Sequence, residues 1–291
     1  MGRPRAERTV GAMTRPLQRP HRAALAATGL RSRARERRDV ARLARPAGPP
    51  STRAVLAELG SGLAAVRLVG ALPRLLGAPR GDGHTVVDIP GWKAPELSGA
   101  PLRAYLGSLG YDARGWGFGT NTGDPRRDVE RLTGRVLELA DERGGPVSLV
   151  GWSLGGVIAR EVARRRPEAV LRVITYGTPV VGGPAFTAVA RAYAPGTSGS
   201  SVVAERLDAE SPIRVPLTVV FTRRDGIVAW EACIDRVSPQ AEHVEVFSTH
   251  IGMGLDPDVW RIVADRLASS AQAWCPRPDR VEVTPGPRPR C

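Results

Sequence analysis

Short apolar runs that alternate with amphipathic stretches restrict the fold of this chain more than any other feature. The runs have the length of strands, and the stretches between them repeat apolar residues every three to four positions, as helices do. The expected strands are residues 85–89, 111–116, 147–151, 170–175, 217–222 and 243–247, and the expected helices are residues 99–109, 125–143, 154–165 and 256–274. This alternation predicts the α/β class, in which helices cover both faces of a mostly parallel sheet.

The alternating pattern predicts one domain over residues 51–274, between a basic arm (residues 1–50) and a proline-rich tail (residues 275–291) that we expect to be disordered. The arm holds thirteen arginines against three acidic residues, so it carries +10 of the net charge of +13. It contains no aromatic residue on which a base could stack, and we therefore expect no nucleic-acid partner. Peripheral contact with a membrane or another lipid surface stays open.

Two apolar segments bear on targeting. Residues 54–76 are interrupted by charged residues and a proline, so they fall short of the ~20 apolar residues of a membrane span, and we predict one or two helices at the domain edge. Residues 23–30 are too short for a convincing signal peptide. These patterns favour a cytoplasmic or membrane-peripheral protein over a secreted one.

The three cysteines, Cys233, Cys275 and Cys291, are odd in number and lack metal-ligand spacing. They establish neither a disulfide framework nor a zinc site.

The sequence Gly151-Trp152-Ser153-Leu154-Gly155 joins an expected strand to an expected helix. Gly-x-Ser-x-Gly alone is a weak signal, but the order strand, tight turn, helix is that of a nucleophile elbow. A serine in a strained turn leaves little room two positions away on either side, which explains Gly151 and Gly155. We predict Ser153 as the nucleophile.

A serine hydroxyl needs a base, and the chain has four histidines. His21 lies in the arm, His84 opens an early strand, and His243 reads most simply as a solvent-facing strand residue. His250 lies in the loop between the expected strand 243–247 and the last helix, so we predict it as the base.

The base in turn needs a carboxylate to orient it. Asp225 directly follows the expected strand 217–222, and the order Ser153, Asp225, His250 is the one required by an elbow of this type. Asp208 and Asp235 are weaker candidates because neither directly follows an expected strand.

An acyl-transfer site also needs two N–H donors for the oxyanion. The backbone of Leu154 is one candidate, and the backbone of Trp92, in the turn Pro90-Gly91-Trp92 that ends strand 85–89, is the other.

These motifs together resemble bacterial lipase-like and esterase-like α/β hydrolases over residues 82–267; they are Ile89-Pro90-Gly91-Trp92, Gly115-Trp116-Gly117, residues 147–156, Asp225-Gly226-Ile227-Val228 and His250-Ile251-Gly252. The resemblance implies the α/β-hydrolase fold, a triad of Ser153, Asp225 and His250, and oxyanion donors at Trp92 and Leu154. The chain departs from the common His-Gly form by carrying Pro90 before Gly91.

The expected activity is cofactor-free hydrolysis of a small-molecule carboxylic ester through an acyl-enzyme. Apolar residues at Trp92, Trp152 and Leu154 favour an apolar acyl chain. Residues 184–216 are either a small lid or a surface loop. Acyltransferase, thioesterase or peptidase activity on the same triad stays open, and so does a non-catalytic binding protein on the same fold.

Overall fold

The computed structural model describes residues 38–40, 43, 45–181, 183–188, 210–270, 274, 276, 278 and 280–284, together with Gly2. The chain divides into two units, residues 1–36 and 37–291, and all the described strands and helices belong to the second.

An eight-stranded sheet forms the centre of this unit, in the order β1-β8-β7-β6-β5-β4-β2-β3. Strands β2 to β8 run parallel, and β1 pairs antiparallel with β8. Their bounds are β1 (Arg38–Asp39), β2 (Thr85–Ile89), β3 (Asp112–Gly115), β4 (Val147–Trp152), β5 (Val170–Tyr176), β6 (Leu217–Phe221), β7 (Ala241–Glu245) and β8 (Arg280–Val283). All six expected strands form close to their expected places, so the prediction of a mostly parallel α/β sheet is confirmed.

The two outermost strands at one edge, β8 and β1, were not expected. The prediction of a disordered arm and tail is wrong for these residues, because Arg38–Asp39 and Arg280–Val283 pair with each other and β8 also pairs with β7. Val281 is fully buried between the two neighbouring strands. The surrounding prolines concealed the alternation of charged and β-branched residues in Arg280–Val283, a pattern typical of a half-buried strand.

The helices are α2 (Thr52–Ala57), α3 (Gly62–Leu75), α4 (Ala100–Ser108), α5 (Pro125–Arg143), α6 (Leu154–Arg165) and α8 (Pro257–Leu267), with 3₁₀ turns η2 (Glu58–Gly60), η3 (Glu96–Gly99), η4 (Pro167–Ala169), η5 (Gly183–Phe186), η7 (Trp230–Cys233) and η8 (Gly252–Leu255). Helix α5 has its expected bounds because Asp124 caps its N-terminus and Gly144, at φ 68°, ends it. Helix α8 ends seven residues before its expected end at Trp274.

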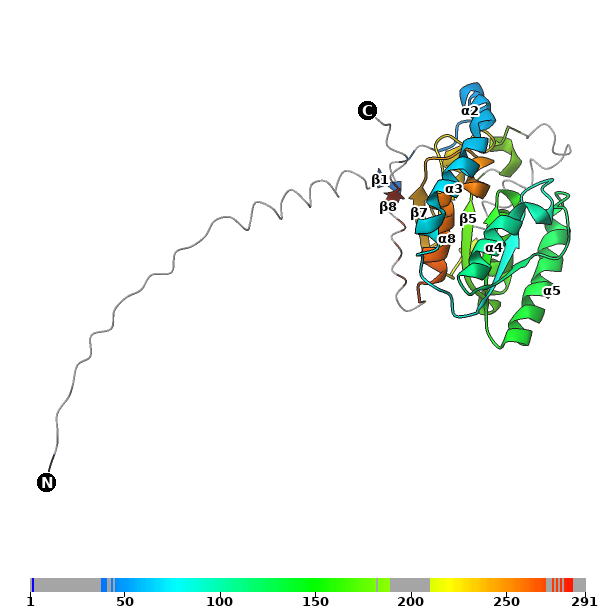
Figure 1. Cartoon of the computed structure of the whole chain (residues 1–291). Coiled ribbons are helices and arrows are strands. Elements are labelled where there is room, and N and C mark those ends of the chain that lie inside the picture. Colours follow the sequence, from blue (N-terminus) through cyan, green and yellow to red (C-terminus); the bar gives the residue numbers. More distant parts are fainter. Residues whose placement is uncertain are drawn as a thin grey trace. The chain divides into compact units, whose positions relative to one another are not determined.

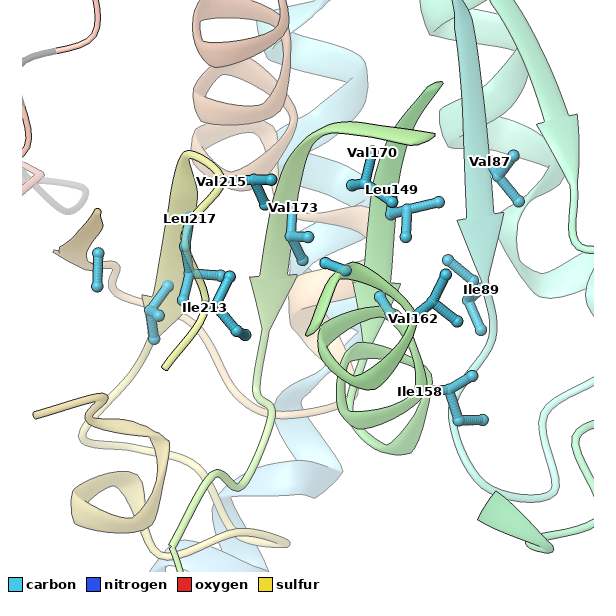
Figure 2. Packing of buried hydrophobic residues seen from close by; sticks show 14 of the residues in the cluster. Val87, Ile89, Leu149, Ile158, Val162, Val170, Val173, Ile213, Val215 and Leu217 are labelled. Carbon is cyan, nitrogen blue, oxygen red and sulfur yellow. The ribbon is translucent and has the colours of Figure 1, made fainter. Parts of the chain in front are cut away.

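Hydrophobic cores lie on both faces of the sheet. On one face, Ile158 and Val162 of α6 pack among Ile89, Leu149 and Val173 of the central strands (Figure 2). The other face is covered by α3, α4 and α8, of which α3 and α8 lie side by side (Figure 1). Tyr105 of α4 stacks on Trp260 of α8, with ring centroids 5.2 Å apart. The expectation of helices on both faces is confirmed.

Residues 52–75 form the helices that were expected at the domain edge. In the part of the chain that the structure describes, no single helix is long and apolar enough to cross a bilayer. The stretches Thr52–Gly60 and Gly62–Leu75 reach that length and apolarity only together, and the chain bends by 47° between them.

Candidate active site

Ser153 lies in a strained turn between β4 and α6. Its backbone has φ 53° and ψ −121°, a conformation that side-chain-bearing residues rarely adopt. The flanking glycines permit the turn: a Cβ at Gly151 would lie 2.5 Å from Gly156 Cα, and one at Gly155 would lie 2.3 Å from Ile89 O. The turn holds Ser153 at the carboxyl end of β4 and at the N-terminus of α6, where the helix dipole favours negative charge.

Asp225 and His250 form a buried pair. The ring Nδ1 of His250 lies 2.7 Å from Asp225 Oδ2, and the two side chains are only 4% and 1% exposed. The other oxygen of Asp225 accepts hydrogen bonds from the backbone N–H groups of Ile227 (2.9 Å) and Val228 (2.7 Å). Because the carboxylate acts as an acceptor throughout, Nδ1 donates to it, and Nε2 of the neutral ring is left as a proton acceptor.

Tyr176, the last residue of β5, and Gly177 directly after it connect the serine turn to the histidine. The N–H of Ser153 donates to Tyr176 O at 2.9 Å. Gly177, at φ 60°, lies so close to the ring that a Cβ there would be 2.9 Å from His250 Nδ1. Our sequence analysis overlooked Gly177, although a glycine directly after a strand is a signal for close approach.

The Pro90-Gly91-Trp92 turn lies next to the serine, since a Cβ added to Gly91 would be 3.3 Å from Ser153 Cβ. Fully buried Asn121 holds this turn: its side-chain amide donates to Pro90 O at 2.8 Å, and its backbone carbonyl accepts from the N–H of Lys93 at 2.7 Å. Leu154 is the first residue of α6. The structure thus brings both predicted oxyanion segments to Ser153, and Asn121 is a second residue that the sequence analysis missed.

Glu58 of η2 is a third residue that the sequence analysis missed. One oxygen of its buried carboxylate accepts from the backbone N–H groups of Gly226 and His250, both at 2.8 Å, and the other accepts from Ile251 at 3.0 Å. It therefore holds the loop after Asp225 and the loop that carries His250. No sequence signal points to this role, because Glu58 precedes its partners by 168 to 193 positions.

The weaker candidates lie elsewhere. Asp235 forms a buried ion pair with Arg160 at 2.8 Å and accepts from the N–H groups of Val237 and Ser238. His84 lies within 3.1 Å of Asp82 and Ser148. His21 and Asp208 lie outside the described residues.

Cys233 is buried, and burial raises the pKa of its thiol well above the usual value. Cys275 and Cys291 lie outside the described residues. No group of three or more His, Cys, Asp or Glu side chains in the described ranges could hold a metal ion.

Most of the lid-or-loop segment, residues 189–209, also lies outside the described part of the chain. Its described beginning runs beside the loop that follows Asp225: Thr187 forms an antiparallel bridge with Val228, and the N–H of Ala188 donates to Ile227 O at 2.7 Å.

The expectation that His243 faces solvent is wrong. Its side chain is buried in β7, where Nε2 accepts from the N–H of Asp235 at 3.1 Å, and Nδ1 has no hydrogen-bond partner among the described residues. Burial lowers the pKa of His243 from 6.5 to about 4. The segment around Asp235 packs against the ring, as the bond from the N–H of Asp235 shows, and this tertiary contact was not expected from the sequence.

This burial predicts a pH-dependent stability. The folded state favours the neutral ring, so stability is fully present above pH 6.5 and falls as the pH drops toward 4, by up to about 1.4 kcal/mol per pH unit, because only the unfolded chain takes up the proton. Urea unfolding at several pH values should give a shallower dependence over this range for His243→Gln than for the wild type. Equal slopes would contradict the assignment.

Comparison with known proteins shows the family of this chain. The model of the Alpha/beta hydrolase family matches residues 86–287, more than half of the chain. Pimeloyl-acyl-carrier-protein methyl ester esterase of Edwardsiella ictaluri is 36% identical over 99 residues, which cover 33% of this chain and 33% of that protein. The esterase of the same name from Aliivibrio salmonicida is 31% identical over 112 residues, 37% of this chain and 40% of that protein.

The matched stretches thus span well under half of these curated relatives. A similar solved structure, described as coming from LipS and LipT, two metagenome-derived lipolytic enzymes, has a TM-score of 0.49 and 18% identity, covering 65% of this chain and 93% of that one. On the strength of the family match, this chain belongs to the alpha/beta hydrolase family.

Proposed function

We propose that this alpha/beta hydrolase cleaves carboxylic esters, with Ser153 as nucleophile, His250 as general base and Asp225 as the carboxylate that orients His250. The observation that carries the proposal is the buried 2.7 Å hydrogen bond between Asp225 and His250. It fixes the protonated nitrogen of the ring and leaves the other nitrogen to accept a proton from the serine.

In the first half of the reaction, Ser153 Oγ attacks the acyl carbonyl carbon while its proton passes to His250 Nε2. The tetrahedral intermediate then expels the alcohol oxygen, which takes the proton from His250, and the acyl group stays on Ser153. In the second half, His250 accepts a proton from water as the water oxygen attacks the acyl-enzyme. Collapse of this intermediate releases the carboxylic acid and returns the proton to Ser153.

The oxyanion of each intermediate would bind the backbone N–H groups of Trp92 and Leu154. The short distance between Gly91 and Ser153 supports this assignment, as does the position of Leu154 in the first turn of α6. Asn121 would keep the Trp92 turn in place through its bonds to Pro90 and Lys93.

The proposed substrate is a small-molecule ester with an apolar acyl chain. Two partial relatives are named as methyl ester esterases, which supports an ester bond as the one cleaved. Trp152 supports the apolar preference, because its ring lies 5.7 Å from that of His250, centroid to centroid.

Labelling with a fluorophosphonate probe, which reacts with activated serines, tests the nucleophile. We expect the wild type and the control variant Ser98→Ala to be labelled, and folded Ser153→Ala to remain unlabelled. Ser98 lies on the surface in η3, so its loss controls for the removal of a hydroxyl. Persistent labelling of Ser153→Ala would refute the nucleophile, and a series of esters graded by acyl length would then define the acyl preference.

A further inference from the structure

An exposed apolar face runs along α2, η2 and α3. Most of the large apolar side chains that are exposed in the described part of the chain lie between residues 55 and 76. Six of them are between 58% and 87% exposed: Leu56, Leu59, Leu63, Val66, Val69 and Leu76. Their spacing of three, four or seven positions puts them on one side of the helices, and we call this set the outer face. A concentration of this kind on a folded domain marks an interaction surface.

The inner side of the same helices is attached to the domain. Ala64, Leu68 and Leu75 are buried, and Arg67 forms ion pairs of 2.8 Å with both Asp256 and Asp258 at the start of α8. A membrane-spanning arrangement would have to break these contacts. The segment is therefore built to lie along a surface with one side on the domain and the other side outward.

The segment that carries the outer face has exposed charges of a single sign. From residue 40 to residue 81 the only acidic residue is Glu58, whose carboxylate is buried and turned toward the domain, and all other charged residues are arginines. Arg53 and Arg74 are exposed on these helices. Residues 1–50, which precede α2 and overlap this segment by eleven residues, carry a net charge of +10. A segment with exposed apolar side chains and exposed cations complements an anionic lipid bilayer, which takes the former among its acyl chains and attracts the latter to its headgroups.

The same charges oppose a second copy of the chain as the occupant. A two-fold dimer through the outer face would bring the exposed Arg53 and Arg74 toward the same arginines of the second copy, and such like-charge contacts are costly.

We propose that the outer face docks on an anionic bilayer, with the helices lying in the headgroup region. The loop that carries His250 lies against the inner side of the same helices, where the N–H of Ile251 donates to Glu58. Docking would therefore leave these helices between that loop and the lipid. The docking itself does not depend on the proposed ester hydrolysis.

Co-sedimentation of the full chain with lipid vesicles tests the proposal. We expect binding to vesicles that contain phosphatidylglycerol, weaker binding to phosphatidylcholine alone, and a loss of at least about tenfold in affinity for Leu63→Glu/Val66→Glu. The matched control Leu137→Glu/Val237→Glu adds two charges at exposed apolar positions elsewhere and should bind like the wild type. A second variant, Leu56→Ser/Val69→Ser, adds no charge and should also bind less.

Three results would overturn the docking proposal. They are absent wild-type binding, unchanged binding of both outer-face variants, and a wild-type dimer that the same variants dissociate without any vesicle binding. Hydrolysis of a water-soluble ester, measured in parallel, should be equal in the outer-face variants and the wild type. A chain that binds vesicles but hydrolyses nothing would refute the proposed function and leave the docking surface supported.

Discussion

Replacing His250 with alanine will lower kcat for the proposed ester hydrolysis by about 10⁶-fold, because it removes the proposed general base. In the proposal, the buried bond to Asp225 leaves Nε2 of His250 to accept the proton of Ser153, and alanine has no such acceptor. Asp225→Asn should cost less, about 10⁴-fold, since the ring is retained but loses the carboxylate that orients it. Steady-state kinetics on a water-soluble ester give both values.

His84→Ala is the matched control for this experiment. Its imidazole lies near Asp82 and Ser148, so its removal should leave kcat close to that of the wild type. Retention of more than a small fraction of activity in folded His250→Ala would mean that another group supplies the base.

Replacing Glu58 with alanine will have the second-largest effect, on both stability and turnover. Three backbone N–H groups lose a charged acceptor in a buried site, which should destabilise the protein by about 3 kcal/mol. Both loops that it holds, those of Asp225 and His250, are then free to shift. A displacement of about 1 Å at the pair should lower kcat about 100-fold. Because Glu58 bonds to the backbone of these loops and would not itself contact the substrate in the proposed mechanism, KM should change little.

Two variants separate positioning from general destabilisation. Glu58→Gln keeps one accepting oxygen and should recover part of kcat. Asp235→Asn removes the charge of another buried carboxylate, one that accepts hydrogen bonds from loop N–H groups. It should lower the free energy of unfolding and leave the kcat of the folded fraction unchanged. Equal losses of kcat in Glu58→Ala and Asp235→Asn, both measured on folded protein, would show that Glu58 acts only through stability.

Local sequence patterns were sufficient for most of the central elements. Helix α5 was expected with its observed bounds because its cap at Asp124 and its stop at Gly144 are short-range signals. The expected length of helix α8 was too great, because the segment after Leu267 carries no strong stop signal. Strand β1 was missed because its partner lies more than 240 positions away in the sequence. Strand β8 was missed because the surrounding prolines concealed its alternation.

The candidate site likewise contains residues that the sequence predicts and residues that only the structure reveals. Ser153 could be found from five residues and their strand-turn-helix setting, and Asp225 and His250 from their positions at the ends of expected strands. The structure then showed that Asp225 and His250 are in contact. It also revealed groups that no motif contains, among them Glu58, Asn121 and Gly177.

By itself, the sequence determined the order of the central strands and helices and which candidate site residues follow the carboxyl ends of those strands. Periodicity, caps and turn residues act over a few positions, so they can be read without the fold. Tertiary structure alone decided that His243 is buried, that Glu58 holds two loops together, and that one side of α3 stays exposed. Those outcomes depend on which distant segments pack against each residue, and packing is set only when the sheet and its covering helices assemble.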